Sequence, residues 1–150
     1  MNIIQATPSD APAIANLFNQ YRVFYGKPDD IALATRFIQE RLSNNESVVF
    51  LARNERGDAV GFTQLYPTFS SVSAQRSWVL NDLFVLDSER GKGMGKALLN
   101  AAKALAIENG ANGLALETAP DNIGAQKLYE SLGYVKDTTY FHYFLDVSSE

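Results

Sequence analysis

The stretch that decides the fold is Glu89-Arg90-Gly91-Lys92-Gly93-Met94-Gly95-Lys96-Ala97-Leu98-Leu99. It follows the apolar, strand-like segment 79–86 and opens a segment with helical spacing. A glycine-rich turn at a helix N-terminus directs several unpaired backbone N–H groups at one point, and the helix dipole adds partial positive charge there. The side chains of Arg90, Lys92 and Lys96 bring formal positive charge to the same turn. The sequence therefore predicts a binding site for a phosphate or pyrophosphate.

Composition and charge exclude several classes of protein. The chain has 150 residues, a formal net charge of −4, no cysteine and one histidine, His142, to which we assign no catalytic role. The lack of cysteine excludes a disulfide framework, a thiol nucleophile and a thiolate metal site, and one histidine makes no multi-histidine centre, so we expect no metal. An acidic chain lacks the electrostatic footprint of a general nucleic-acid-binding protein. We also expect no membrane partner and a cytoplasmic location, because signal-peptide and membrane-spanning patterns are missing from the sequence.

The order of elements predicts one α/β domain over residues 1–150, built on a mixed sheet. Strands are expected at 2–6, 47–53, 59–66, 78–86, 114–118 and 139–147. Helices are expected at about 8–24, from a cap at Asp29 or Asp30 to about 42, at 93–109 and at 123–132. Thr7 and Asn122 are the expected N-caps of their helices, and Gly110 suits a left-handed C-terminal cap. The serine-rich segment 67–75 is expected to form a polar loop.

Three kinds of phosphate-binding loop compete for the glycine-rich turn. A P-loop requires G-x-x-x-x-G-K-[S/T], but Ala97 follows Gly95-Lys96 and Arg90 stands where the first glycine belongs, so this interpretation fails. A dinucleotide fingerprint requires G-x-G-x-x-G with an acidic residue about 20 positions on, and Glu117 lies at about that distance. The glycines here are spaced G-x-G-x-G, however, and the connection through 87–90 is too long for a tight first turn.

The third pattern, Arg90-x-x-Gly93-x-Gly95, resembles the R/Q-x-x-G-x-G/A motif of the GNAT superfamily of N-acetyltransferases. Downstream, Asn122-x-x-Ala125-x-x-Leu128-Tyr129-Glu130-x-x-Gly133-Tyr134 is similar to the second signature of that family. The two motifs stand in the family's order, and the likeness covers residues 78–147. It implies a mixed, splayed central sheet of about six or seven strands flanked by about four helices. It also implies that acetyl-CoA is the co-substrate and lies between the strands 78–86 and 114–118.

The resemblance assigns contacts with CoA to particular residues. The pyrophosphate would be held in a cradle that begins at Arg90 and uses the backbone N–H groups of Gly91, Lys92, Gly93, Met94, Gly95 and Lys96. The pantetheine arm would pair with the main-chain groups of Leu83, Phe84 and Val85. The Val85 amide would then polarise the thioester carbonyl as an oxyanion-type donor. Asn122 would cap its helix and also contact the co-substrate.

The same resemblance makes Tyr129 the general acid that protonates the departing CoA thiolate. The attacking amine must also lose a proton. Asn81 and Asp82 stand where one branch of the family commonly has Glu-Asp, but an asparagine is not a base, and alternation along a strand predicts that the two side chains face opposite sides. Asp82, Glu117 and a water relay all remain open as routes for the proton, and we favour the relay.

The acceptor side rests on a likeness to the branch of polyamine, thialysine and fungal histone/polyamine acetyltransferases. Tyr21-Arg22-x-Phe24-Tyr25 resembles the segment that lines the acceptor site there, although Tyr21 and Phe24 also fit the core spacing of their helix. Aromatic faces beside carboxylates suit an alkylammonium ligand, so Tyr25, Phe24 and Glu117 are the candidate substrate residues.

These resemblances lead us to expect an acyl-CoA-dependent N-acetyltransferase. The expected acceptor is a primary amine of a small cationic molecule or of a lysine-like side chain, which attacks acetyl-CoA directly in a ternary complex. A peptide N-terminus or an aminoglycoside is the alternative acceptor, and a non-catalytic acyl-CoA-binding regulatory module is the alternative function. The family also implies a homodimer, paired through the final aromatic strand.

Overall fold

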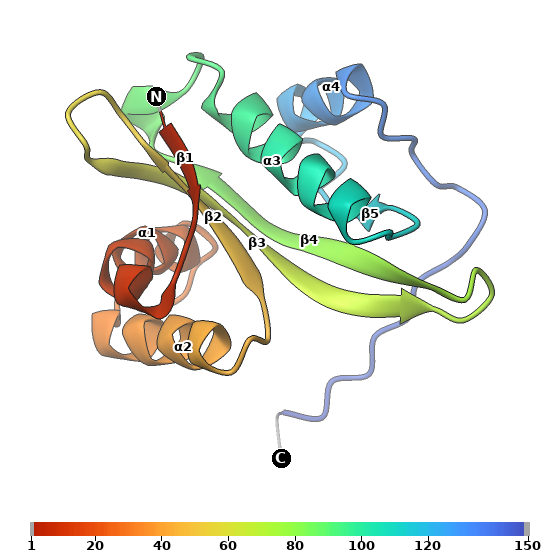
Figure 1. The fold of residues 1–150 in the computed structure, drawn as a ribbon, viewed down its shortest axis with the longest axis horizontal. Helices are drawn as coiled ribbons and strands as arrows, with labels where there is room; N and C mark the ends of the chain where they lie inside the picture. The colour runs from red at the N-terminus through yellow and green to blue at the C-terminus, as the bar shows by residue number, and fades with distance from the viewer. Residues whose placement is uncertain (1, 149–150) are drawn as a thin grey trace. The chain divides into compact units, whose positions relative to one another are not determined.

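Five strands in the order β1-β2-β3-β4-β5 form the sheet of this computed structural model, which describes residues 2–148 (Figure 1). The strands are β1 (Asn2–Gln5), β2 (Val48–Arg53), β3 (Ala59–Ser70), β4 (Gln75–Val85) and β5 (Leu114–Ala115). The first four pair antiparallel, and β5 pairs parallel with β4. The expected mixed α/β class is confirmed, with five strands instead of six or seven.

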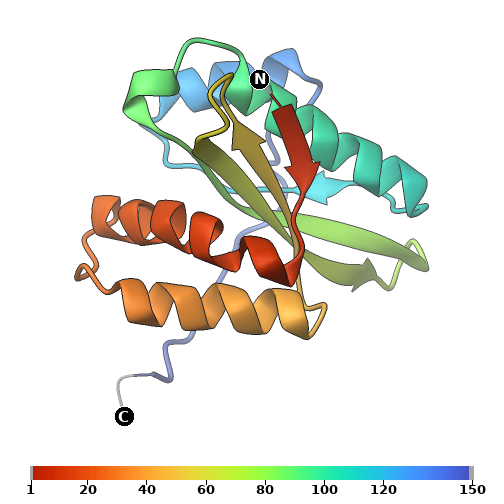
Figure 2. The same cartoon turned by 60° about the vertical axis from the view of Figure 1, so that its left-hand side comes forward.

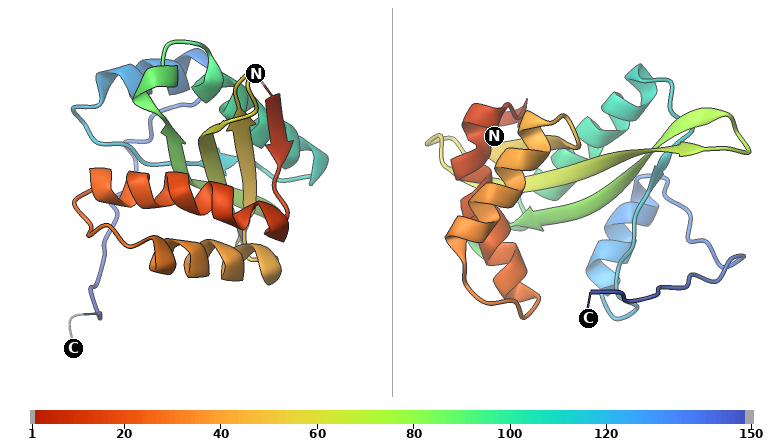
Figure 3. Two further views of the ribbon diagram at one scale, coloured as in Figure 1. Left: turned by 90° about the vertical axis from the view of Figure 1, so that its left-hand side faces the viewer. Right: turned by 90° about the horizontal axis from the view of Figure 1, so that it is seen from below.

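Residue contacts divide the chain into two units, Met1–Glu117 and Thr118–Glu150. In the first unit, α1 (Ala11–Phe24) and α2 (Ile31–Ser43) cover one face of the sheet and α3 (Met94–Glu108) covers the other (Figure 2, Figure 3). Short 3-10 turns at Pro8–Asp10 and Asp87–Glu89 precede α1 and α3. The second unit contains α4 (Ile123–Ser131). Within residues 2–148 no helix is long and apolar enough to cross a membrane.

The capping signals in the sequence set the helix ends as predicted. Thr7 and Asp10 form a capping box in which the Thr7 N–H donates to Asp10 Oδ2 at 2.9 Å. Asp30 begins α2 by accepting the Leu33 N–H at 3.1 Å. Gly110 adopts a φ of +68° directly after α3, which is the left-handed conformation expected of a C-terminal cap.

The main core lies between the first two helices and the face of the sheet that they cover. Its buried members share helical spacing on α1 and α2 and alternation on β2 and β3. They are Ala11, Ile14, Ala15, Leu17, Phe18, Ala34, Ile38, Leu42, Val49, Leu51 and Phe62. On the opposite side of the sheet, α3 buries Leu98, Leu99 and Ala102. Because both faces of β3 and β4 are covered by helices, these two strands form a fixed support for the loop that follows β4.

The long β3–β4 hairpin corrects the prediction of a polar loop at 67–75. Strand β3 continues to Ser70 and β4 starts at Gln75, so that the turn is confined to residues 71–74. Pro67 pairs with Trp78 at a point where β2 has already ended, since the pairing of β2 with β3 stops at Leu65. One edge of β3 is open there, and the missing N–H of a proline therefore does not break the ladder.

The C-terminal part of the chain differs most from the prediction. The strand expected at 114–118 is limited to Leu114–Ala115, and residues 135–148 contain no strand where one was expected at 139–147. In this segment Phe141, Tyr143 and Phe144 are 91%, 94% and 90% exposed. Strand propensity describes how well side chains fit a neighbouring strand, so an aromatic, β-branched segment forms a strand only where such a neighbour is present.

Candidate functional site

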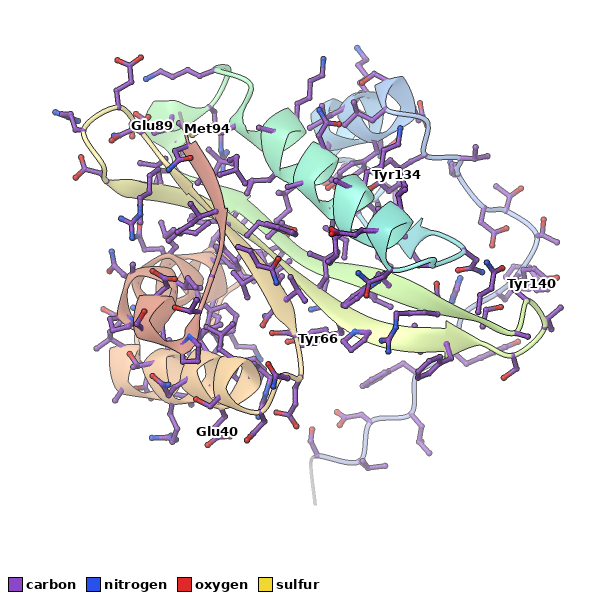
Figure 4. All side chains as sticks on the ribbon, viewed as in Figure 1. Glu40, Tyr66, Glu89, Met94, Tyr134 and Tyr140 are labelled. Atoms are coloured by element: carbon purple, nitrogen blue, oxygen red, sulfur yellow. The ribbon has the colours of Figure 1, made fainter. Side chains whose placement is uncertain are left out.

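The glycine-rich loop after β4 leaves open space in front of its backbone. Figure 4 labels Glu89 and Met94 at the two ends of this loop. Gly91 and Gly93 have φ values of +77° and +84°, a region that side chains other than glycine rarely adopt. A Cβ atom built on either residue would meet no atom within 4 Å. The glycines are therefore required by the turn of the chain, and the space beside them is available to a ligand.

The N-terminus of α3 directs hydrogen-bond donors at that space. The first hydrogen bond at this end runs from the Ala97 N–H to the Gly93 carbonyl at 3.0 Å. The N–H groups of Met94, Gly95 and Lys96 therefore have no acceptor within the helix, as is general for the first donors of an α-helix. Met94 is buried and holds this end of the helix in place. Converging N–H groups and the positive end of the helix dipole suit a phosphate.

The basic side chains of the loop are largely engaged by the protein itself. Arg90 donates from Nε to the Val85 carbonyl at 3.1 Å, and its Nη1 lies 2.9 Å from Asp87 Oδ1. Lys92 Nζ lies 3.3 Å from Glu89 Oε2. Arg90 thus braces the loop against the end of β4, and the backbone N–H groups contribute the donors that remain for a ligand.

The outer edge of β4 is open along its second half. Strand β5 pairs with β4 only at Trp78 and Val79, so that within residues 2–148 no strand pairs with the outer edge of β4 beyond Val79. The Leu86 N–H donates to Val60 on β3 at 2.9 Å, which fixes the direction of the backbone groups at this end of β4. Because these groups alternate along a strand, Leu83 and Val85 direct theirs at the open edge, while those of Phe84 face β3.

A β-bulge in β4 changes the predicted directions of Asn81 and Asp82. Gln64 pairs with Asp82, but its neighbour Leu65 pairs with Leu80, so that Asn81 is the extra residue. A bulge suspends alternation where it occurs. Asn81 Nδ2 consequently lies 3.2 Å from Asp82 Oδ1, although strict alternation would place these two side chains on opposite faces. This corrects the sequence-based expectation.

Asp82 is buried, with 6% of its surface exposed, and three side chains hydrogen-bond its carboxyl group. Gln64 donates from Nε2 to Asp82 Oδ2 at 2.9 Å, Asn81 donates to Oδ1, and the Tyr21 hydroxyl on α1 makes a third bond. Burial raises the pKa of the Asp82 carboxyl, and the hydrogen bonds from Gln64, Tyr21 and Asn81 oppose that rise. The site thus contains a carboxyl group whose basicity is increased by its surroundings.

The sequence analysis missed Gln64 and its neighbour Ser47. Ser47 Oγ donates to Gln64 Oε1 at 2.8 Å, and Gln64 is fully buried. An uncharged polar residue within the apolar strand 59–66 was the available signal, since a buried amide must find partners. Ser47 gave no such signal, because it stands at the end of the strand expected at 47–53.

A cavity of about 590 Å³ opens between α1 and the end of β4. Apolar side chains of Phe24, Phe84 and Leu86 line it together with the polar side chains of Asn19, Asp29 and Arg90. Asp29 Oδ1 accepts a hydrogen bond from Asn19 Nδ2 at 2.7 Å, which holds this carboxylate at the cavity. Phe84 and Asp82 are two residues apart on the same strand, so the cavity lies along the face of β4 that carries Asp82.

The three predicted substrate residues occupy different places. Phe24 lines the cavity and is 69% exposed, so it is not a core residue. Tyr25 is exposed, and its ring packs edge-on against Phe24 and Tyr21 with centroid distances of 5.3 and 5.1 Å. Glu117 lies two residues beyond β5 on the surface.

In the second unit, α4 carries the other predicted residues. Asn122 caps the helix as expected, because its Oδ1 accepts the Ala125 N–H at 3.3 Å. The helix ends at Ser131 and is followed by Gly133, whose φ is +96°, and the Tyr134 N–H donates to the Tyr129 carbonyl at 3.1 Å. This turn brings the rings of Tyr129 and Tyr134 to a centroid distance of 5.9 Å.

Comparison with known proteins identifies the family. Residues 12–134 match the model of the Acetyltransferase (GNAT) family. The chain belongs to this family. It is 53% identical over 150 residues, the full length of both chains, to the uncharacterized N-acetyltransferase YhfO of Bacillus subtilis (strain 168).

Two further proteins extend the comparison. The chain is 29% identical over 134 residues, 87% of its own length and 82% of the relative's, to the D-amino-acid N-acetyltransferase HPA3 of Saccharomyces cerevisiae. It also superimposes on a solved structure of a probable acetyltransferase with a TM-score of 0.93 and 40% identity, over 100% of both chains. The protein is an acyl-CoA-dependent N-acetyltransferase, and acetyl-CoA is the co-substrate of its family.

Asp82 predicts a pH dependence of stability whose sign follows from its burial. The pKa of Asp82 in the folded state is raised above the ordinary value of 3.8 that holds in the unfolded chain. At pH values between the ordinary and the raised pKa, the folded state therefore binds more protons than the unfolded state. The corresponding stabilisation is complete below the ordinary pKa and is lost as the pH rises through the raised pKa. The free energy of unfolding of the wild type, minus that of Asp82→Asn, should therefore fall with rising pH. Urea unfolding at a series of pH values measures this difference, and a difference that stays level or increases would contradict the prediction.

Proposed function

We propose that the protein transfers an acetyl group from acetyl-CoA to a primary amine of a small cationic molecule or of a lysine-like side chain. The observation that carries this proposal is the position of Asp82, a buried carboxyl group on the half of β4 whose outer edge is open. The acetyl donor would lie along that edge, and the amine would approach from the face that carries Asp82. Both substrates would then be present together, and transfer would proceed by direct attack.

The donor would be held mainly by the backbone. The N–H groups from Gly91 to Lys96, in the loop braced by Arg90, would bind the CoA pyrophosphate at the start of α3. The outward-facing groups of Leu83 and Val85 would pair with pantetheine, as an added strand pairs with an open sheet edge. Phe84 would contribute its ring to the wall of the cavity rather than its backbone. Asn122 is proposed as a further contact by resemblance to the family.

The chemistry follows from what each group can donate or accept. Asp82 would take one proton from the ammonium form of the acceptor, through a water molecule because its carboxyl is buried. The neutral amine attacks the thioester carbonyl carbon, and the Val85 N–H stabilises the negative charge that develops on the carbonyl oxygen. The carbon–sulfur bond then breaks as Tyr129 protonates the CoA thiolate, and the second proton of the nitrogen passes through water to the Tyr129 phenolate. Asp82 finally returns its own proton to solvent. Asn81 would orient the Asp82 carboxyl and cannot itself serve as the base.

The cavity beside α1 supports a cationic acceptor. Asp29 places a carboxylate at this cavity, and Phe24 and Tyr25 expose aromatic surface next to it, a combination that attracts an alkylammonium group. The relative HPA3 is named for D-amino acids, whose acceptor group is also an amine. Glu117 stays a candidate because it lies on the surface just beyond the short strand β5. A peptide N-terminus or an aminoglycoside is the alternative acceptor.

Three broader predictions complete the proposal. Residues 1–150 are proposed to form one acetyltransferase domain, and a cytoplasmic location without nucleic-acid or membrane partners stays a prediction from the sequence. The protein is also proposed to be a homodimer.

The exposed aromatic residues of 135–148 support the homodimer, because apolar surface of this kind commonly marks an interface. Sedimentation analysis should give the mass of a dimer for the wild type and of a monomer for the double variant Tyr143→Ser, Phe144→Ser. A wild-type monomer at micromolar concentration would contradict the proposal.

Release of free CoA thiol tests the reaction itself. The protein is mixed with acetyl-CoA and a panel that contains a diamine, L-lysine, a D-amino acid, a peptide with a free N-terminus and an aminoglycoside. We expect thiol release that depends on the acceptor and is fastest with the diamine or lysine, with the singly acetylated amine detected by mass spectrometry. Faster release with the peptide or the aminoglycoside would overturn the acceptor class. CoA binding in calorimetry without release for any amine would favour the regulatory module.

Tyr129 has a matched control in Tyr134. Tyr129→Phe should lower kcat by about 100-fold, because the thiolate then leaves without a positioned acid. Tyr134→Phe should leave kcat near the wild-type value. The Tyr134 hydroxyl is buried without a hydrogen-bond partner in the described part of the chain, so its removal leaves no other group unpaired. Steady-state kinetics over a range of pH checks both variants, and wild-type kcat in Tyr129→Phe at every pH would refute the assigned role.

A further inference from the structure

We propose that Gln64 is a positioning residue, which holds the Asp82 carboxyl ionised and in one orientation for the proton transfer described above. This inference rests on the proposed function, because it concerns the group that accepts the proton of the acceptor amine. Gln64 would act only through Asp82, and Ser47 would in turn orient Gln64. Ser47 directly precedes β2, and Gln64 and Asp82 lie on β3 and β4, so that this chain of hydrogen bonds crosses the sheet.

Gln64 is placed directly opposite Asp82 by the register of β3 and β4. Its Nε2 donates to Asp82 Oδ2 at 2.9 Å, and none of its surface is exposed. A hydrogen bond from an amide to a carboxylate favours the ionised form, because a protonated carboxyl group presents one acceptor fewer. Burial acts in the opposite direction on the pKa of Asp82, and among the hydrogen bonds the one from Gln64 opposes this rise most.

Ser47 decides which end of the Gln64 amide faces Asp82. Its hydroxyl donates to Gln64 Oε1 at 2.8 Å, so the amide oxygen is held toward β2 and the amide nitrogen toward β4. A rotated amide would place its oxygen against the Asp82 carboxylate, where two acceptors repel each other. With both ends of the amide engaged, the Asp82 carboxyl has one preferred orientation and a permanent donor on Oδ2.

Side chains from α1, β3 and β4 surround Asp82. Tyr21 faces it from α1, Asn81 lies beside it on β4, and Tyr66 lies close by on β3 (Figure 4). Burial, and secondly the charge of Asp82, raises the pKa of Tyr66 to about 12, while Arg41 on α2 and a hydrogen bond with Gln64 oppose this rise. Tyr66 therefore stays neutral beside Asp82.

Two variants test the role of Gln64. Gln64→Met keeps the length of the side chain and removes the amide, and Ser47→Ala removes only the hydroxyl that orients it. With the best acceptor of the panel, the acid limb of kcat/KM should move to higher pH in both variants. On that limb kcat/KM should fall about tenfold for Gln64→Met and less for Ser47→Ala, and should recover toward the wild-type value on the alkaline side. Loss of structure alone would lower kcat/KM at every pH.

Thr63→Val is the matched control. Thr63 is buried next to Gln64 on β3, and its hydroxyl donates to the backbone carbonyl of Asp82 at 2.8 Å, not to the carboxyl. This variant also loses one buried hydrogen bond, but the acid limb should not move. If Gln64→Met does not fold, Ser47→Ala still tests the inference, because Ser47 lies just before β2 and the substitution removes one oxygen atom.

A second measurement separates this inference from the proposed reaction. The carboxyl carbon of Asp82, assigned by its loss in Asp82→Asn, is titrated by ¹³C NMR in each variant without any substrate. A titration that moves to higher pH in Gln64→Met and Ser47→Ala supports the inference even if the enzyme accepts none of the amines tested. An unchanged titration in both variants overturns it, and so does a shifted titration with an unmoved pH profile in an active enzyme.

Discussion

One extra residue in β4, Asn81, shifts the pairing of everything that follows it in the strand. Before the bulge, β4 is paired on both edges, to β3 and to the short β5. After it, only the β3 side is paired, and the outward groups of Leu83 and Val85 face an open edge. The bulge also places the side chains of Asn81 and Asp82 in contact with each other. The bulge thus precedes the edge at which the thioester is proposed to pair, and it sets the position of the carboxyl group that is proposed to accept the proton.

Removing the Asp82 carboxylate from water costs free energy, and the hydrogen bonds of the surrounding residues offset this cost in part. A carboxylate removed from water requires hydrogen bonds to its charged form, or else it takes up a proton. Gln64, Asn81 and Tyr21 supply such bonds from β3, β4 and α1, and each of these elements is fixed by the core on that face of the sheet. The result is a group that is more basic than an exposed aspartate and is still able to ionise. A proton acceptor that works near neutral pH needs this balance.

Sequence signals succeeded where the determinant was local. The glycines at 91 and 93, the caps Thr7 and Asp30 and the second signature at 122–134 act through their own backbone and nearest neighbours, so reading them needs no tertiary information. The sequence-based predictions that were wrong concern features that depend on contacts between distant segments. A strand at 139–147 requires a partner edge, the hairpin beyond Pro67 depends on where β2 ends, and the bulge at Asn81 depends on the register of β3. Gln64 gains its role only when that register sets it opposite Asp82.

The same difference between local and distant determinants distinguishes the proposed binding site of the acetyl donor from that of the amine acceptor. The proposed donor site is built from backbone N–H groups, because the loop's own Arg90 and Lys92 are bound to Asp87 and Glu89. A site of that kind depends on glycines and a helix start, which a short motif can specify. The proposed acceptor site is built from side chains on α1, β3 and β4, each of which can change while the backbone stays the same. A family that shares this fold can therefore share one donor and differ in its acceptors, and the acceptor has to be inferred from the side chains around Asp82 and Asp29.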